Sequence, residues 1–168
     1  MTTALVSLRQ ARVADADALA AIHAESWRSA YQGILPHLPL QRMIARRGPG
    51  WWHEQLGQDM SALVVSFEDE PVGYATFGRA RLRGAPFGGE IFELYVSTVF
   101  QGLGFGKRLF EGARQRLEDR RLKGLLVWAI VDNPRACNFY LDRGGRPVAK
   151  TTERFADVPV KKVAFGWR

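Results

Sequence analysis

The stretch from Leu94 to Lys107 runs from an apolar strand into a glycine-rich turn that opens a helix. Glycine has no Cβ, so the backbone of such a turn can approach a ligand closely. The first N–H groups of a helix lack partners within the helix, and with the helix dipole they attract anions. The pattern therefore predicts a phosphate-binding turn, to which Lys107 adds positive charge.

Two common phosphate motifs do not fit this turn. The dinucleotide fingerprint fails because Lys107 stands where its third glycine is required. The P-loop fails because Gln101 occupies its first glycine position and Arg108 stands where Ser or Thr would hold Mg²⁺. These mismatches disfavour a nucleotide oxidoreductase and a nucleoside triphosphatase. A turn whose glycines serve only tight packing is the alternative to a phosphate site.

A second segment, Asn133 to Tyr140, follows the apolar run 125–131. Asn133 is expected at the N-cap of a helix, with Pro134 at its first position, where the missing N–H costs nothing. Asn133 and Tyr140 are two helical turns apart, so an amide and a phenol share one face of the helix. Phe139 is expected to point elsewhere and to serve the core.

Together, the two segments resemble the GNAT superfamily of acyl-CoA-dependent N-acetyltransferases. The similarity lies in Gln-x-x-Gly-x-Gly after a Leu-Tyr-Val strand, then Asn-Pro and Asn-Phe-Tyr with Gly-Gly-Arg beyond. It covers essentially the whole chain, including the strand order. The resemblance implies an acyltransferase that moves an acetyl group from acetyl-CoA, its co-substrate, to an amine without a metal. One departure is Gly145, where many members carry Phe, and it leaves the packing on the acceptor side open.

The resemblance also implies roles for individual residues. The backbone of Leu94, Tyr95 and Val96 is expected to bond the pantetheine arm. Asn133 is expected to contact the cofactor, and Tyr140 to lie near the thioester sulfur. The pyrophosphate is expected on the N–H groups of Gln101, Gly102, Leu103, Gly104, Phe105, Gly106 and Lys107.

Amine acylation needs a base for the amine proton and an acid for the departing thiolate. Tyr140 is the candidate acid, and a buried tyrosine that only caps a backbone group is the alternative. A carboxylate in an apolar strand is costly unless it is paired, and such a carboxylate suits a base. Glu93 is the first candidate base, Glu90 at the strand start is the second, and an ordered water chain is the third. Either glutamate could instead be paired with one of the many arginines.

The acceptor site is expected from the first two helices and their link. Its candidate substrate-binding residues are Trp27, Arg28 and Tyr31, and the same region carries His23, Glu25, Gln32 and Ile34. His23 is expected to be a satisfied residue at the edge of the core. Cys137 lies one turn into its helix, a position that could lower its pKa, but a free cysteine usually serves as a small buried hydrophobe.

These residues require a frame of strands and helices in one α+β domain over 1–168. Strands are expected at 5–9, 62–67, 72–78, 90–96, 125–131, 148–150 and 160–167. Helices are expected at about 15–31, from about 38 until the break at 48–50, at about 104–121 and at 134–143, with a further turn at 51–52. The expected fold is a GNAT-like α/β/α layered arrangement around a mixed, mostly antiparallel sheet.

Composition bounds the remaining possibilities. The 168 residues are 46% apolar and 24% charged, as in ordinary globular proteins. One cysteine excludes an intramolecular disulfide framework, and three scattered histidines give no metal-ligand spacing. The N-terminus lacks the pattern of a signal peptide, and the longest apolar runs are too short to span a membrane, so the cytoplasm is expected.

The net charge of +7 favours an anionic partner. The phosphates of CoA are the simplest one. No nucleic-acid recognition motif is found, and the basic residues are spread over the chain. Transfer of a larger acyl group and a non-catalytic acyl-CoA sensor remain as alternatives. A small-molecule or a protein amine fits as acceptor, and the chain could be a monomer or a homodimer.

Overall fold

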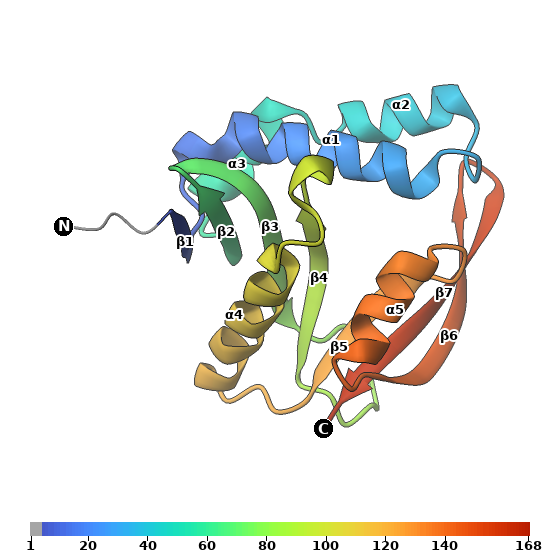
Figure 1. The fold of residues 1–168 in the computed structure, drawn as a ribbon. Coiled ribbons are helices and arrows are strands. Elements are labelled where there is room, and N and C mark those ends of the chain that lie inside the picture. Colours follow the sequence, from blue (N-terminus) through green and yellow to red (C-terminus); the bar gives the residue numbers. More distant parts are fainter. Residues whose placement is uncertain (1–4) are drawn as a thin grey trace. The chain divides into compact units, whose positions relative to one another are not determined.

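A computed structural model describes residues 5–168, which form five α-helices, two short 3-10 turns and seven strands (Figure 1). The helices are α1 (Ala16–Tyr31), α2 (His37–Ala45), α3 (Pro49–Gly57), α4 (Phe105–Asp119) and α5 (Pro134–Asp142). The 3-10 turns are η1 (Val13–Asp15) and η2 (Thr98–Phe100). The strands are β1 (Val6–Gln10), β2 (Ala62–Phe67), β3 (Glu70–Arg79), β4 (Gly89–Val96), β5 (Leu125–Ile130), β6 (Arg146–Phe155) and β7 (Val158–Trp167). No helix in this part of the chain is long and apolar enough to cross a membrane.

The strands pair in the order β1-β2-β3-β4-β5-β7-β6. β4 and β5 are parallel, with a register from Gly89–Leu125 to Ile91–Val127. The pairs β1–β2, β2–β3, β5–β7 and β6–β7 are antiparallel. The sheet is therefore mixed and mostly antiparallel, as predicted.

Two elements differ from the sequence prediction. The helix from about 38 ends before Gly48-Pro49-Gly50, as predicted, but the further turn expected at 51–52 is the nine-residue helix α3, which begins at Pro49 with Gly48 as its N-cap. β6 has ten residues where three were expected. Its polar sequence gives little strand signal, and its length depends on pairing with β7 across a turn at Ala156 and Asp157, where both φ angles are positive.

The described chain divides into two compact units. The first holds residues 5–76 and Glu93–Ala113, and the second holds Phe77–Phe92 and Arg114–Arg168. β3, β4 and α4 each contribute residues to both units. The single domain expected over 1–168 stays a prediction.

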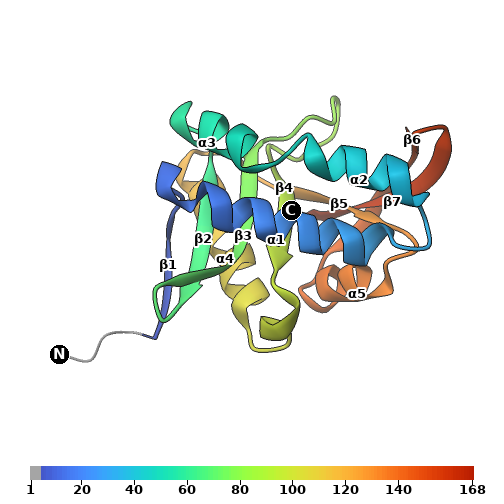
Figure 2. The same ribbon diagram turned by 90° about the horizontal axis from the view of Figure 1, so that it is seen from above.

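In the first unit, α1 and α3 cover one face of β2 and β3 (Figure 2). Their shared core consists of Ala16, Leu19, Ala20, Ile22, Trp52, Leu56, Val64 and Tyr74. The opposite face packs on α4. Gly112 of α4 approaches it so closely that a Cβ there would lie 2.5 Å from Leu8 and 3.2 Å from Leu63. Because side chains alternate along a strand, Leu63 and Val64 serve different layers.

In the second unit, the β5–β7–β6 part of the sheet carries an aromatic cluster. Tyr140 of α5 packs on Phe165 and Trp167 of β7, with ring centroids 5.8 and 6.0 Å away. A Cβ on Gly145 would come within 2.5 Å of the Trp167 ring. Trp167 therefore fills the space next to the position where many GNAT members carry Phe.

Candidate functional site

The turn between β4 and α4 owes its shape to two glycines in the left-handed region. Gly102 has φ +79° and Gly104 has φ +88°, and a Cβ built at either would have nothing within 4 Å. The backbone conformation therefore requires glycine here, and close packing does not. The side chain of Gln101 ties the turn to the strand, because its Nε2 donates to the Val96 carbonyl at 2.9 Å.

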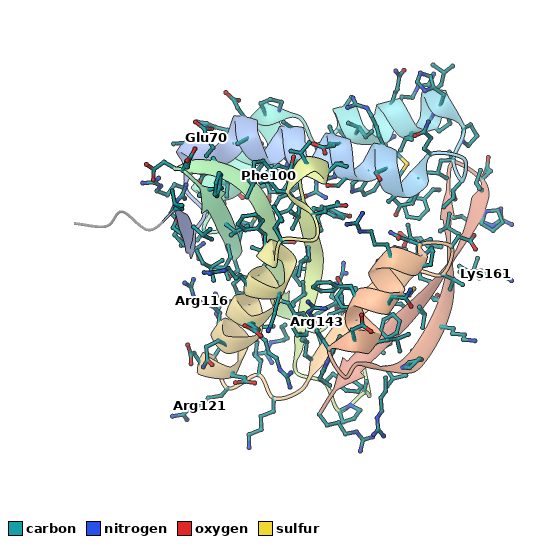
Figure 3. All side chains as sticks on the ribbon, in the orientation of Figure 1. Glu70, Phe100, Arg116, Arg121, Arg143 and Lys161 are labelled. Atoms are coloured by element: carbon teal, nitrogen blue, oxygen red, sulfur yellow. The ribbon has the colours of Figure 1, made fainter. Side chains whose placement is uncertain are left out.

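Aromatic contacts and hydrogen bonds hold this turn to the rest of the first unit. Phe100, labelled in Figure 3, packs on Phe67 and Phe105 with centroids 5.8 and 5.9 Å away. Glu25 of α1 accepts hydrogen bonds from the Thr98 N–H at 2.6 Å and the Ser97 hydroxyl at 3.1 Å. The bond with Thr98 is the main cause that lowers the pKa of Glu25.

The outer part of the turn is open to solvent. Gly102, Leu103 and Gly104 are exposed, whereas the Phe105 side chain is buried. Of Phe105, only the backbone can therefore serve a ligand at this surface. Lys107 is exposed and lies 3.9 Å from Glu111 one helical turn on. The turn therefore exposes the backbone of two glycines, together with the Leu103 side chain, where an anion is expected.

Glu93 of β4 is the centre of a hydrogen-bonded cluster in the first unit. Arg47 donates to both carboxylate oxygens, at 2.7 and 2.8 Å. The Tyr74 hydroxyl and the Thr76 hydroxyl each lie 3.3 Å from one of these oxygens. Four hydrogen bonds therefore converge on this carboxylate. The sequence had left open that Glu93 pairs with an arginine, and the structure identifies Arg47.

Arg47 lies between aromatic rings. Its guanidinium is 4.3 Å from the centre of the Trp51 ring and 4.9 Å from that of Trp52, distances typical of cation–π contacts. The two indoles meet at 87° with their centroids 5.0 Å apart. Two indole faces and a carboxylate thus surround one cation.

His23 lies directly beside this cluster. Its Nε2 is 4.0 Å from a Glu93 oxygen, a distance too long for a hydrogen bond. The side chain is fully buried, and neither ring nitrogen has a hydrogen-bond partner among residues 5–168. Burial, together with the charge of Arg47, lowers the pKa of His23 to about 3. The expectation of a satisfied histidine was wrong, because its neighbours are the rings of Trp27, Trp52 and Tyr95 and neither of its nitrogens has a hydrogen-bond partner there.

Two of the predicted acceptor-site residues continue the aromatic contacts of His23 along α1. Trp27 stacks on His23 at 5.1 Å and on Tyr31 at 4.8 Å, so the three rings follow one face of the helix. Tyr31 is buried. Arg28 is exposed. The structure thus brings Trp27 and Tyr31 to the Glu93 cluster through His23.

Glu90, the second candidate base, lies in the second unit and is also paired. Arg81 donates to it through its backbone N–H at 3.1 Å and through its guanidinium at 2.7 Å. The Glu90 side chain is 1% exposed, whereas that of Arg81 is 71% exposed. Glu90 therefore fixes the start of the connection between β3 and β4. Its role as a base stays a prediction.

The α5 segment confirms one prediction and corrects another. The Asn133 side chain accepts from the Ala136 N–H at 3.2 Å, so it caps the helix as expected. Tyr140, however, is the ring in the core, and burial raises its pKa. Phe139 is only half-buried, and the guanidinium carbon of Arg143 lies 3.6 Å from the centre of its ring.

Cys137 agrees with the expectation of a small hydrophobe. Burial raises its pKa, so the start of the helix does not activate the thiol. Its thiol lies 3.5 Å from the Ile130 carbonyl, as a weak donor. Cys137 therefore matches a small buried hydrophobe better than an activated thiol.

The comparisons with known proteins agree with these features. The family model described as acetyltransferase (GNAT) family matches residues 18–144. The chain belongs to this family. The GNAT chain is similar to the uncharacterized N-acetyltransferase YuaI of Bacillus subtilis (strain 168), with 26% identity over 165 residues that cover 97% of this chain and 93% of that protein.

Solved structures show the same fold at low identity. The PaiA N-acetyltransferase from Thermoplasma acidophilum, in complex with coenzyme A, has a TM-score of 0.75 and 15% identity, covering 96% of this chain and 98% of that one. The protein YncA from Salmonella typhimurium, solved with its cofactor acetyl-CoA, has a TM-score of 0.69 and 16% identity, covering 98% and 94%. The predicted fold class, α+β and GNAT-like, is confirmed, and the chain is an acetyltransferase of this family.

Proposed function

We propose that this GNAT protein transfers an acetyl group from acetyl-CoA to a primary amine by direct attack in a ternary complex. The observation that carries the proposal is the exposed turn at Gly102 and Gly104, which leads from β4 into the first turn of α4. Its free backbone N–H groups and helix dipole suit a pyrophosphate. This GNAT chain therefore has a turn that suits the pyrophosphate of acetyl-CoA.

The co-substrate would lie along β4 and its turn. The backbone of Leu94 to Val96, beyond the register with β5, would bond the pantetheine arm. The Gln101 N–H already donates to the Thr98 carbonyl at 3.3 Å, so the N–H groups of residues 102–107 would hold the pyrophosphate. The exposed Lys107 side chain would move from its 3.9 Å contact with Glu111 toward it. The side-chain oxygen of Asn133 already caps α5, which leaves its NH₂ group for the cofactor.

The chemistry needs one proton removed and one supplied. As the amine nitrogen bonds to the acetyl carbon, the carbon–sulfur bond breaks and the thiolate leaves. Tyr140 would donate a proton to that thiolate, and its raised pKa keeps the phenol protonated at neutral pH. Glu93 is the first candidate to accept the amine proton, with Glu90 and a water chain as the alternatives. Trp27, Arg28 and Tyr31 would contact the acceptor.

A panel of amines tests the proposal. Thiol release from acetyl-CoA would be followed with alkylamines, aminosugars and peptides with a free N-terminus, in the presence of a chelator. We expect release that depends on one class of amine, with an N-acetylated product identified by mass. Release with longer acyl-CoA only would favour the larger-acyl alternative. Binding of acetyl-CoA without transfer to any amine would favour a sensor.

The other expectations also stay predictions that these assays can address. They are a small-molecule or protein acceptor, a monomer or homodimer, a cytoplasmic location, and no metal requirement. No specific binding of nucleic acid is expected either.

A further inference from the structure

The guanidinium of Arg47 occupies a site that is built for a cation. Its walls are the Trp51 and Trp52 rings, 4.3 and 4.9 Å from the guanidinium carbon, and its floor is the Glu93 carboxylate. Trp52 is fully buried, and the Glu93 side chain is 12% exposed. A largely buried carboxylate beside aromatic rings is an arrangement that recognises organic cations.

Arg47 is partly exposed in this site, and one of its N–H groups is not hydrogen-bonded to any described residue. It lies in the short connection between α2 and α3, and its side chain is 21% exposed. Its Nε is buried and has no hydrogen-bond partner within the described part of the chain. A buried N–H without a partner costs free energy, so this arginine is less well satisfied than a purely structural ion pair would be.

The bonds of Glu93 make the position of Arg47 important for the reaction. While Arg47 holds both oxygens, with Tyr74 and Thr76 beside it, the carboxylate has little capacity left for a substrate. Simple departure of Arg47 would leave a mostly buried charge without a partner, which is costly. Replacement by another cation avoids that cost.

We infer that Glu93, Trp51, Trp52 and Tyr74 form the binding site for the protonated amino group of the acceptor, and that Arg47 is an internal placeholder which the acceptor displaces. The inference rests on the proposed function, because it assigns the acceptor's ammonium group to this site. It makes the acceptor a cationic alkylamine whose ammonium group contacts the two indole rings that Arg47 now contacts. Glu93 can accept the first proton of the ammonium only after Arg47 has left; the neutral amine then attacks, and the second proton that leaves its nitrogen balances the one that Tyr140 gives to the thiolate.

Binding of butylammonium without acetyl-CoA tests the inference at pH 7.5, where the amine is charged. Titrations would follow the Trp indole N–H signals by NMR in wild type and in Arg47→Gln. Removing the competing cation should tighten butylammonium binding about tenfold, the effect of losing one cation–π and ion-pair competitor. Butanol, uncharged and of similar size, should not bind to either protein.

Two control variants separate the outcomes. Arg47→Lys keeps a cation but loses the paired guanidinium N–H groups that bond both oxygens of Glu93. Its affinity for butylammonium should therefore fall between those of wild type and Arg47→Gln. Glu93→Gln added to Arg47→Gln should abolish the gain. Equal affinity of wild type and Arg47→Gln, or the same tightening for butanol, would overturn the inference. If Arg47→Gln does not fold, Arg47→Lys decides in its place, and an affinity equal to that of wild type overturns the inference.

The result is distinguishable from a failure of the proposed function. If wild type and Arg47→Gln bind butylammonium equally while thiol release from acetyl-CoA is intact, only the inference is contradicted. Tight amine binding without acetyl transfer would contradict only the proposed function.

Discussion

Replacing His23 with leucine should make the protein less sensitive to acid. The folded first unit keeps this imidazole neutral, since burial and the charge of Arg47 lower its pKa to about 3. In the unfolded chain its pKa is about 6.5. Below that pH the unfolded state binds a proton that the folded state does not, so stability falls as pH decreases from 6.5 toward 3.

The size of the effect follows from the two pKa values. Each pH unit between them is worth about 1.4 kcal/mol. On going from pH 7.5 to pH 5.0, the effect begins at the unfolded-state pKa of about 6.5 and so acts over about one and a half pH units. His23 should therefore lower the unfolding free energy of wild type by about 2 kcal/mol over this interval. His23→Leu should lose that much less over the same interval. A change in absolute stability caused by the buried leucine is the same at both pH values and does not alter this difference.

Urea unfolding at the two pH values, followed by tryptophan fluorescence, gives the measurement. His53→Leu is the matched control, because His53 is exposed on α3, and its pH dependence should equal that of wild type. Equal losses of unfolding free energy in wild type and His23→Leu would refute the argument that His23 is buried in its neutral form.

Three further predictions concern the turn and the acid. Gly104→Ala places a side chain at φ +88°, which strains the backbone by about 1–2 kcal/mol, and we expect acetyl-CoA affinity by calorimetry to fall about tenfold. Gly84→Ala, at φ +76° with equal space around it, should lose similar stability but no affinity, and equal losses in both would contradict the reasoning. Tyr140→Phe should lower kcat and kcat/KM together by about 10–10²-fold while cofactor affinity stays intact, and an unchanged kcat would make Tyr140 a packing residue. Glu25→Gln should cost about 1 kcal/mol of unfolding free energy and raise the KM for acetyl-CoA, because a charged acceptor is lost at Thr98, and an unchanged KM would show that this anchor does not shape the turn.

The turn and its flanking strand could be predicted because their signals are local. An apolar run, then Gln101 and two glycines that leave the right-handed region, specify β4, the turn and α4 within fifteen residues of sequence. The cap at Asn133 is local in the same way. Backbone conformation decides these features, and the residues that require it are next to one another.

The partners of the site residues could not be predicted, because tertiary packing decides them. A carboxylate inside an apolar strand requires a cation, but nothing in the sequence distinguishes Arg47 from the other arginines. Which of Phe139 and Tyr140 faces the core depends on where β7 places Phe165 and Trp167. The missing partners of His23 follow from the rings packed around it, which periodicity along α1 does not reveal.

The most direct test of direct acetyl transfer is a single-turnover experiment with acetyl-CoA labelled in the acetyl group. The protein would be mixed with the labelled co-substrate, with and without the amine that the panel identifies. We predict that thiol is released only when the amine is present and that the label passes to the amine nitrogen without appearing on the protein. Thiol release before the amine is added, with label retained on Cys137 or another side chain, would contradict transfer in a ternary complex.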